Sequence, residues 1–268
     1  MNAVPLIALN VFRESVRDKV LYNLVFFAIL LMGASYLIGQ LTAGQDVKII
    51  KDLGLAATSV FGLFIAVFIG IGLVSKEVER RSIYSLLAKP IERHHLLLGK
   101  YLGLALTLAV NLAIMALALY AVLAYMAWTA DPLLAKAWER PALDPAMLQA
   151  VALTFVELAI VTAIALFFST FSTPMLSAAF TFGLFVAGRF SADLRNFNDV
   201  VESPAAAWLA RGLYWVLPNL APFDVRAQVV HGVPVPAGYL ALTSAYGAAY
   251  IAALLVASMA IFARRDFK

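Results

Sequence analysis

The sequence predicts an all-α integral membrane protein with six transmembrane helices. Hydrophobic residues make up 63% of the 268 residues, and only 13% are charged. A soluble domain is typically about 45–50% apolar and about 25% charged, and a core of this size cannot hide so much apolar surface from water. Long charge-free runs also recur along the chain, several of them near the roughly 20 residues that a spanning helix needs. Lipid is therefore the expected solvent for most of the chain.

The charge-free runs locate the six spans within a single domain over residues 1–268. We place the spans at residues 20–41, 53–74, 101–128, 148–168, 175–188 and 239–263. A polar loop with prolines, "TADPLLAKAWERPALDPAM", separates the third span from the fourth. The sequence "STFSTP", which ends at Pro174, separates the fourth from the fifth.

Two segments do not fit as spans. Residues 4–18, "VPLIALNVFRESVRD", are too short and too charged, but their apolar residues recur at helical spacings. They predict an amphipathic helix lying in the membrane interface, with a solvated N-terminal segment as the alternative. Residues 203–230 are apolar and aromatic but are interrupted by Arg211 and three prolines. They predict short interfacial or re-entrant helices, which lipid tolerates only where protein or water covers the broken backbone.

The distribution of cations predicts the orientation. Lys and Arg are concentrated in residues 13–19, 76–100 and 264–268, next to predicted spans, whereas the others, among them Lys51, are spread thinly over the other side. Short loops rich in Lys and Arg remain in the cytoplasm. We therefore expect a multi-pass protein of the cell (inner) membrane with both termini cytoplasmic. This rule also explains the pI near 9.3 without a nucleic-acid partner.

The most charged of these segments is "VSKEVERRSIYSLLAKPIERHHLLLGKY", residues 74–101. Its first part is a good helix former that extends the second span, and Ile83, Leu86 and Leu87 then form an apolar stripe. The Lys89–Pro90 pair ends the helix before the chain returns into the third span. The pattern fits either an element that docks into a groove of a partner or a basic loop that rests on lipid.

The segment from Glu77 to Lys100 resembles the cytoplasmic loop of ABC-2 permeases, the membrane subunits of type V ABC exporters. The matching residues are Glu77, Glu79, Arg80, Ser82, Leu86, Leu87, Ala88, Pro90, Ile91, Arg93, Leu97, Gly99 and Lys100. The predicted six spans and the "LPN" sequence at 217–219 also resemble that family, and the short NosY-like permeases are the most similar group. Arg81 stands where the family usually has glycine.

The resemblance implies that this loop couples the permease to a separately encoded cytoplasmic ABC ATPase. The implied coupling residues are Glu77, Glu79, Arg80, Arg81, Ser82, Leu86, Leu87, Pro90, Arg93 and Lys100. It also implies a dimer of permeases, either of two copies or with a related chain. The chain is not itself expected to be an enzyme, because Gly99-Lys100 is followed by Tyr101 and no P-loop is present. We expect no catalytic residue, metal or cofactor here, with ATP and Mg²⁺ bound by the ATPase.

Glu157 is the one acid inside a predicted span. Intramembrane carboxylates are expensive, so Glu157 is expected either to line the substrate pathway or to pair with a cation or a polar group such as Asn111. We interpret Arg189, just after the fifth span, as a headgroup anchor. Two other function classes stay open: a membrane anchor for an ATPase without transport of its own and, with less support, a membrane-embedded enzyme. The substrate is not readable from the spans.

Overall fold

The computed structural model describes residues 3–41, 45–79, 93–130, 138, 140–191, 212 and 217–264. Within this part the chain is helical and contains no strand, as the fold class predicted. The elements are α1 (Ala3–Ser15), α2 (Lys19–Gln40), α3 (Asp46–Glu79), α5 (Arg93–Thr129), α7 (Ala146–Ser169), α8 (Pro174–Arg189), the 3₁₀ turn η2 (Ala221–Phe223), α11 (Arg226–Val230) and α12 (Ala237–Arg264).

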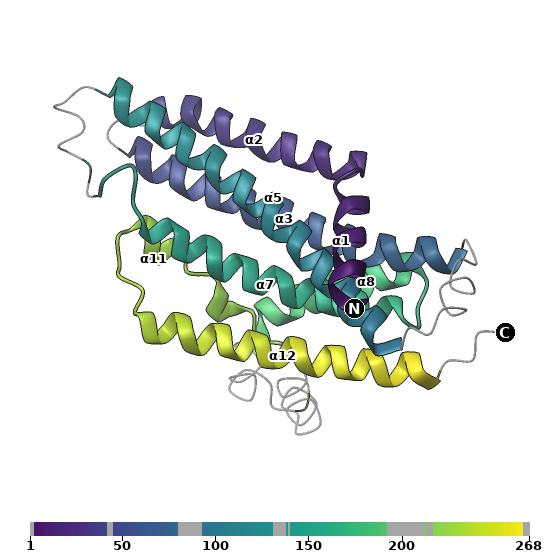
Figure 1. The fold of residues 1–268 in the computed structure, drawn as a ribbon. Helices are drawn as coiled ribbons and strands as arrows, with labels where there is room; N and C mark the ends of the chain where they lie inside the picture. Colours follow the sequence, from purple (N-terminus) through teal and green to yellow (C-terminus); the bar gives the residue numbers. More distant parts are fainter. Residues whose placement is uncertain are drawn as a thin grey trace.

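Five long helices run side by side along the molecule (Figure 1). α2, α3, α5, α7 and α12 are each long and apolar enough to cross a membrane. The N-terminus and the end of α12 lie at one end of the bundle, and α11 lies at the other (Figure 1). α8 has 16 residues, or about 24 Å of helix, which is shorter than the roughly 30 Å hydrocarbon core. Five described helices therefore have spanning length, against the six spans predicted.

α7 forms the centre of the bundle, and its second half is almost entirely buried. α3 packs closely against α7 at two glycines. A Cβ atom added to Gly62 would lie 2.5 Å from Leu158 Cδ1, and one added to Gly70 would lie 2.6 Å from Ala165 Cβ. Small residues allow this kind of close helix contact in membranes. α2 and α12 lie at the two flanks and expose large apolar side chains, as expected where acyl chains replace water.

Two long helices begin before the predicted spans. α3 starts at Asp46 rather than near 53, and α5 starts at Arg93 rather than near 101. The reason is that a charge-free run marks only the most apolar part of a helix, whereas polar turns continue it beyond the hydrocarbon. Lys51 consequently lies inside α3 and not in a loop: it is 1% exposed and donates to the Pro141 carbonyl at 2.8 Å, with Asp144 Oδ2 4.0 Å away.

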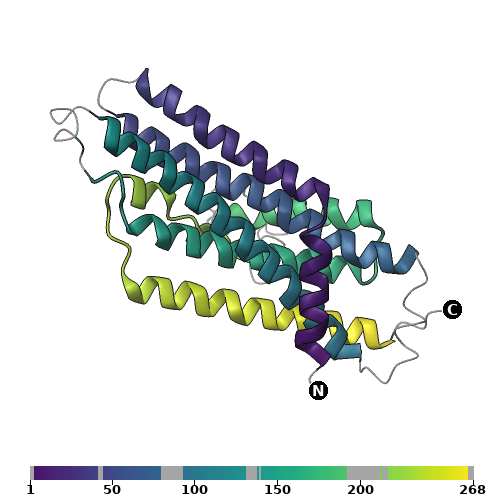
Figure 2. The ribbon, with the colours of Figure 1, turned by 45° about the horizontal axis from the view of Figure 1, so that its top comes forward.

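α1 lies across the bundle rather than along it (Figure 2). It covers the first turns of α5, where a Cβ on Gly99 would lie 2.7 Å from Ile7 Cβ and one on Gly103 would lie 2.6 Å from the Ala8 carbonyl oxygen. Val11 is buried in this contact, while Leu6 is exposed. The predicted helix therefore forms, and two glycines one turn apart hold it against α5.

α8 and the segment 217–230 meet in the middle of the bundle. α8 starts beside the end of α7, and its last residue, Arg189, contacts Glu157 near the middle of α7. The described part of the predicted 203–230 segment then continues along α7 and α3 toward α11, with Leu220, Phe223 and Val229 buried. Residues 203–211 and 213–216 lie outside the described part. The segment 217–230 is therefore held against protein on its apolar side, while Asp224, Ala227 and Gln228 are exposed.

Candidate functional site

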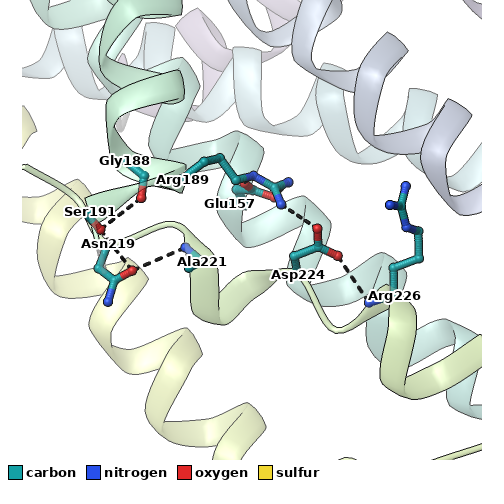
Figure 3. A network of polar contacts seen from close by, with 8 residues as sticks. All are labelled: Glu157, Gly188, Arg189, Ser191, Asn219, Ala221, Asp224 and Arg226. Atoms are coloured by element: carbon teal, nitrogen blue, oxygen red, sulfur yellow. Dashed lines mark hydrogen bonds and ion pairs between the residues drawn. The ribbon is translucent and has the colours of Figure 1, made fainter. Parts of the chain in front are cut away.

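Charged side chains meet where α8 ends. The Arg189 guanidinium lies between two carboxylates: Nε is 2.9 Å from Glu157 Oε1, and Nη2 donates to Glu157 Oε2 at 3.0 Å. Nη1 donates to Asp224 Oδ2 at 2.5 Å, as Figure 3 shows. We call Glu157, Arg189, Asp224 and Arg226 the charged joint. It connects α7, α8 and the segment between η2 and α11.

Burial differs sharply across the charged joint. The side chain of Glu157 is 1% exposed, that of Arg189 is 23% exposed and that of Asp224 is 38% exposed. A buried carboxylate needs a partner of opposite charge. The Arg189 guanidinium gives Glu157 one charge-assisted hydrogen bond, to Oε2, and lies at ion-pair distance from Oε1. The Arg189 guanidinium also lies 5.4 Å from the centroid of the Phe185 ring. Glu157 is therefore neutralised from α8.

The backbone beside the joint is held by a second set of polar contacts. Pro218 and Pro222 interrupt helical hydrogen bonding, which leaves backbone groups in need of partners. The Leu220 N–H donates to the Gly188 carbonyl at 3.0 Å, and the Asn219 side chain accepts from Ser191 Oγ at 3.1 Å and from the Ala221 N–H at 3.3 Å. These contacts, drawn in part in Figure 3, fix the segment to the end of α8.

Asp224 has a second set of neighbours on the α11 side. The Arg226 N–H donates to Asp224 Oδ1 at 3.2 Å, and Arg226 Nε lies 3.1 Å from Asp52 Oδ1 on α3. Burial alone would raise the pKa of the Asp224 carboxyl, but the hydrogen bond and charge of Arg189, with those of Arg226, outweigh it and lower the pKa. Asp224 is therefore ionised, and charges alternate from Asp52 through Arg226, Asp224 and Arg189 to Glu157.

A small polar cavity lies against the charged joint. Its volume is about 20 Å³, and its lining includes Ser59, Thr154, Glu157, Arg189 and Asp224. That is room for about one water molecule. The joint is thus a mainly ionic contact with little free space around it.

Comparison with known proteins decides the class. Residues 6–267 match the sequence model of the ABC-2 family transporter proteins. The chain belongs to the ABC-2 transporter family. No curated protein matches it. The match covers nearly the whole ABC-2 chain, so the membrane permease class inferred from the loop motif is confirmed, whereas the NosY-like subgroup stays a prediction.

The structure shows which partner Glu157, the acid inside a predicted span, contacts. Of the alternatives left open for Glu157, the geometry shows pairing with a cation, Arg189. Asn111 does not share this contact, since its amide donates to the Thr107 carbonyl in its own helix at 2.7 Å. Arg189, interpreted from the sequence as a headgroup anchor, pairs in the structure with Glu157 and Asp224. The sequence held one signal for this pair: Glu157 lies inside the fourth predicted span, and Arg189, of opposite charge, follows the fifth.

The expected coupling residues are only partly within the described chain. Glu77 and Glu79 belong to the last turn of α3, and Arg93 begins α5. Lys100 lies in α5 next to the α1 contact and is 5% exposed. Arg80, Arg81, Ser82, Leu86, Leu87 and Pro90 lie outside the described residues. The prediction that the second span extends as a helix into this loop is confirmed as far as Glu79.

Proposed function

We propose that this chain is the permease subunit of an ABC exporter that works as a dimer with a separately encoded cytoplasmic ATPase. The observation that carries the proposal is the family match over residues 6–267, on a bundle with five helices of spanning length. ATP and Mg²⁺ are bound by the partner ATPase, and the permease supplies the pathway.

The bundle supports six crossings if one of them is built from two pieces. α8 covers the half of α7 nearest the termini, and 217–230 covers the other half. The two pieces together reach from one end of the bundle to the other (Figure 1). An even number of crossings agrees with α1 and the end of α12 lying at one end of the bundle (Figure 1), and the cations near that end favour the cytoplasmic side.

Coupling to the ATPase is assigned to residues 75–100. The ends of α3 and α5 flank this loop, so a force on it would reach two central helices directly. α1 covers the start of α5 at Gly99 and Gly103 and so lies beside the same region. We propose that the acidic and basic side chains from Glu77 to Arg93 contact the ATPase and that Leu86 and Leu87 fill its groove. Lys100 is 5% exposed in α5, so a coupling role for it would act through the helix rather than by direct contact.

The pathway role of Glu157 and Asn111 is open to a direct test. Pairing with Arg189 supports a structural role for Glu157, because the carboxylate is already neutralised. Transport that Glu157→Gln leaves unchanged across pH would remove Glu157 from the pathway. Asn111→Ala separates the two residues, since Asn111 bonds only within its own helix in the described contacts.

Co-purification with an ATPase tests the proposed function. The charge reversal Glu79→Arg/Arg80→Glu should abolish capture of the ATPase and substrate-stimulated ATP hydrolysis while the permease stays in the membrane. Arg13→Glu is the matched control, because Arg13 is an exposed cation at the same end of the bundle but on α1. An intact complex and normal hydrolysis in the reversal variant would refute the coupling role. A complex that hydrolyses ATP without moving any cargo would instead favour the anchor function.

A further inference from the structure

Arg189 contacts two carboxylates, Glu157 and Asp224, and breaking the two contacts would have different consequences. Glu157 is 1% exposed, and Arg189 is the one cation that contacts it among the described residues. Separation of this pair would leave a buried charge with neither water nor a counter-charge, which is the most destabilising arrangement for an ion pair. The contact between α7 and α8 is therefore expected to stay closed.

Asp224 is in the opposite position. It is 38% exposed, it accepts a hydrogen bond from the Arg226 N–H, and the Arg226 charge lies nearby. If Arg189 moved away, the N–H and the charge of Arg226 would still stabilise the Asp224 carboxylate. Arg189 would also keep Glu157. Release of Asp224 thus leaves no charge without a partner.

The backbone around this contact allows a local movement. Two hydrogen bonds join the segment to the end of α8 before the chain reaches Asp224. The Leu220 N–H donates to the Gly188 carbonyl, and Ser191 Oγ donates to the Asn219 side chain. These two bonds can act as a pivot. Beyond the pivot the chain consists of a three-residue 3₁₀ turn, the pair Asp224 and Val225, and a five-residue helix. Arg226 ties this part to Asp52 on α3 rather than to α8. The small cavity lies where the two parts meet.

We propose that the contact between Arg189 and Asp224 is a latch that opens and closes during transport, while the contact between Arg189 and Glu157 remains closed. Opening moves the segment from Asp224 to α11 away from α8 and admits water to the cavity beside Ser59. The latch rests on the proposed transport function, to which it adds the position of a gate on the α11 side of the bundle. Arg189 acts as a positioning residue in this scheme.

A single reporter cysteine can follow the latch, because the chain contains no native cysteine. Ser59→Cys places a thiol in the cavity wall, and its reaction with a small water-soluble methanethiosulfonate reagent measures water access in the full-length permease in lipid nanodiscs. Adding Asp224→Asn should raise the labelling rate about fivefold, the shift expected from losing one partly exposed ion pair. Adding Glu157→Gln instead leaves the Arg189–Asp224 contact intact, so labelling should stay within about twofold of the reporter alone. Equal rates with Asp224→Asn and Glu157→Gln would overturn the proposal.

Salt provides a second measurement that needs no change in the joint. Concentrated salt weakens the partly exposed Arg189–Asp224 contact far more than the buried one, so labelling of Ser59→Cys should rise with NaCl. A rate that salt leaves unchanged would contradict the latch even if Asp224→Asn does not fold. In the complex with its ATPase, the rate should differ between the ATP-bound and nucleotide-free states. Constant labelling in a complex that still transports would refute the latch and leave the transporter function standing.

Discussion

α1 and the segment 217–230 both pack on long helices and neither spans the bundle by itself, but their contacts differ in how much charge contributes to them. α1 lies against α5 where two residues have no side chain, Gly99 and Gly103, and the closest approaches are to backbone and aliphatic atoms. The segment 217–230 meets α7, α8 and α3 through the charged joint and the Arg226–Asp52 pair. The segment 217–230 also buries apolar side chains, among them Leu220, Phe223 and Val229. Its contact therefore combines shape with charge, whereas the α1 contact depends on shape.

This difference predicts what each contact responds to. Close packing without charges is insensitive to pH and salt, but a single added methyl group changes it. An ionic contact tolerates small changes of volume, yet it fails when one charge is removed and the other stays buried. Close packing therefore suits a contact that stays closed, as we expect for α1, and an ion pair suits one that opens, as we propose for Asp224. The variants below break each contact in its own way.

The largest effect is expected from Arg189→Met, which removes the charge and keeps much of the side-chain volume. Glu157, 1% exposed, would be left without its cation, and breaking a buried pair in this way costs about 3–5 kcal/mol. The free energy of unfolding of the detergent-solubilised permease, compared with wild type, measures the loss.

The double variant Arg189→Met/Glu157→Gln supplies the control for this prediction. It removes both charges of the pair, so Glu157 no longer leaves a buried charge without a partner and most of the stability lost in Arg189→Met should return. Asp224 keeps Arg226 as a neighbour in this variant. A double variant as unstable as Arg189→Met would mean that Arg189 stabilises the protein through packing rather than through charge.

The next effect is expected from Gly103→Leu in the α1 contact. Its Cβ would lie 2.6 Å from the Ala8 carbonyl oxygen, a backbone atom that cannot turn aside. Overpacking of this kind costs about 1–3 kcal/mol, and α1 should separate from α5. Tryptic cleavage at Arg13 in membranes should become faster. Gly33→Leu on α2 is the matched control, since nothing lies within 4 Å of a Cβ there, and it should leave cleavage unchanged.

Sequence reasoning found the membrane class and most helices because the bilayer imposes a simple rule. A span must be long and apolar, so the charge-free runs from 20, 53, 101, 148 and 239 each fell within a helix of spanning length. Helix ends were less accurate, as at Lys51, because polar turns continue a helix at no penalty outside the hydrocarbon. The fifth run also forms a helix, α8, but this helix has only 16 residues and its last residue contacts the middle of α7, so it is shorter than the predicted span.

The site was only partly predictable for a related reason. Glu157 could be selected because one acid in an apolar run is conspicuous. Its partner could not, because Arg189 follows a run that was taken to reach the membrane surface. Asp224 lies farther along the chain, after two prolines, and no local pattern links it to Arg189. Only the folding of 217–230 back along α7 brings these three residues together.

The pH dependence of stability should separate the ionic contact from the α1 contact. The pKa of Asp224 is below its ordinary value of 3.8, so its contribution to stability is complete above that value and is lost as the pH falls through the lower folded-state pKa. The difference in thermal midpoint between wild type and Asp224→Asn should be constant from about pH 8 to pH 5 and shrink below about pH 4. The difference between wild type and Gly103→Leu should not follow pH in this way. A difference for Asp224→Asn that already shrinks between about pH 8 and pH 6 would contradict the assignment of an ionised Asp224.

The smallest effect is expected from the Arg226–Asp52 pair, which belongs to the charge chain but lies near the surface. Its two side chains are 39% and 51% exposed, and exposed pairs contribute about 0–1 kcal/mol. Arg226→Gln and Asp52→Asn should each change the free energy of unfolding by no more than that, and the double variant by about as much as either single one. The small value matters for the comparison, because it places the stability of the charged joint in the buried Glu157–Arg189 contact. A loss near that of Arg189→Met in either single variant would show instead that the whole chain of charges acts as one unit.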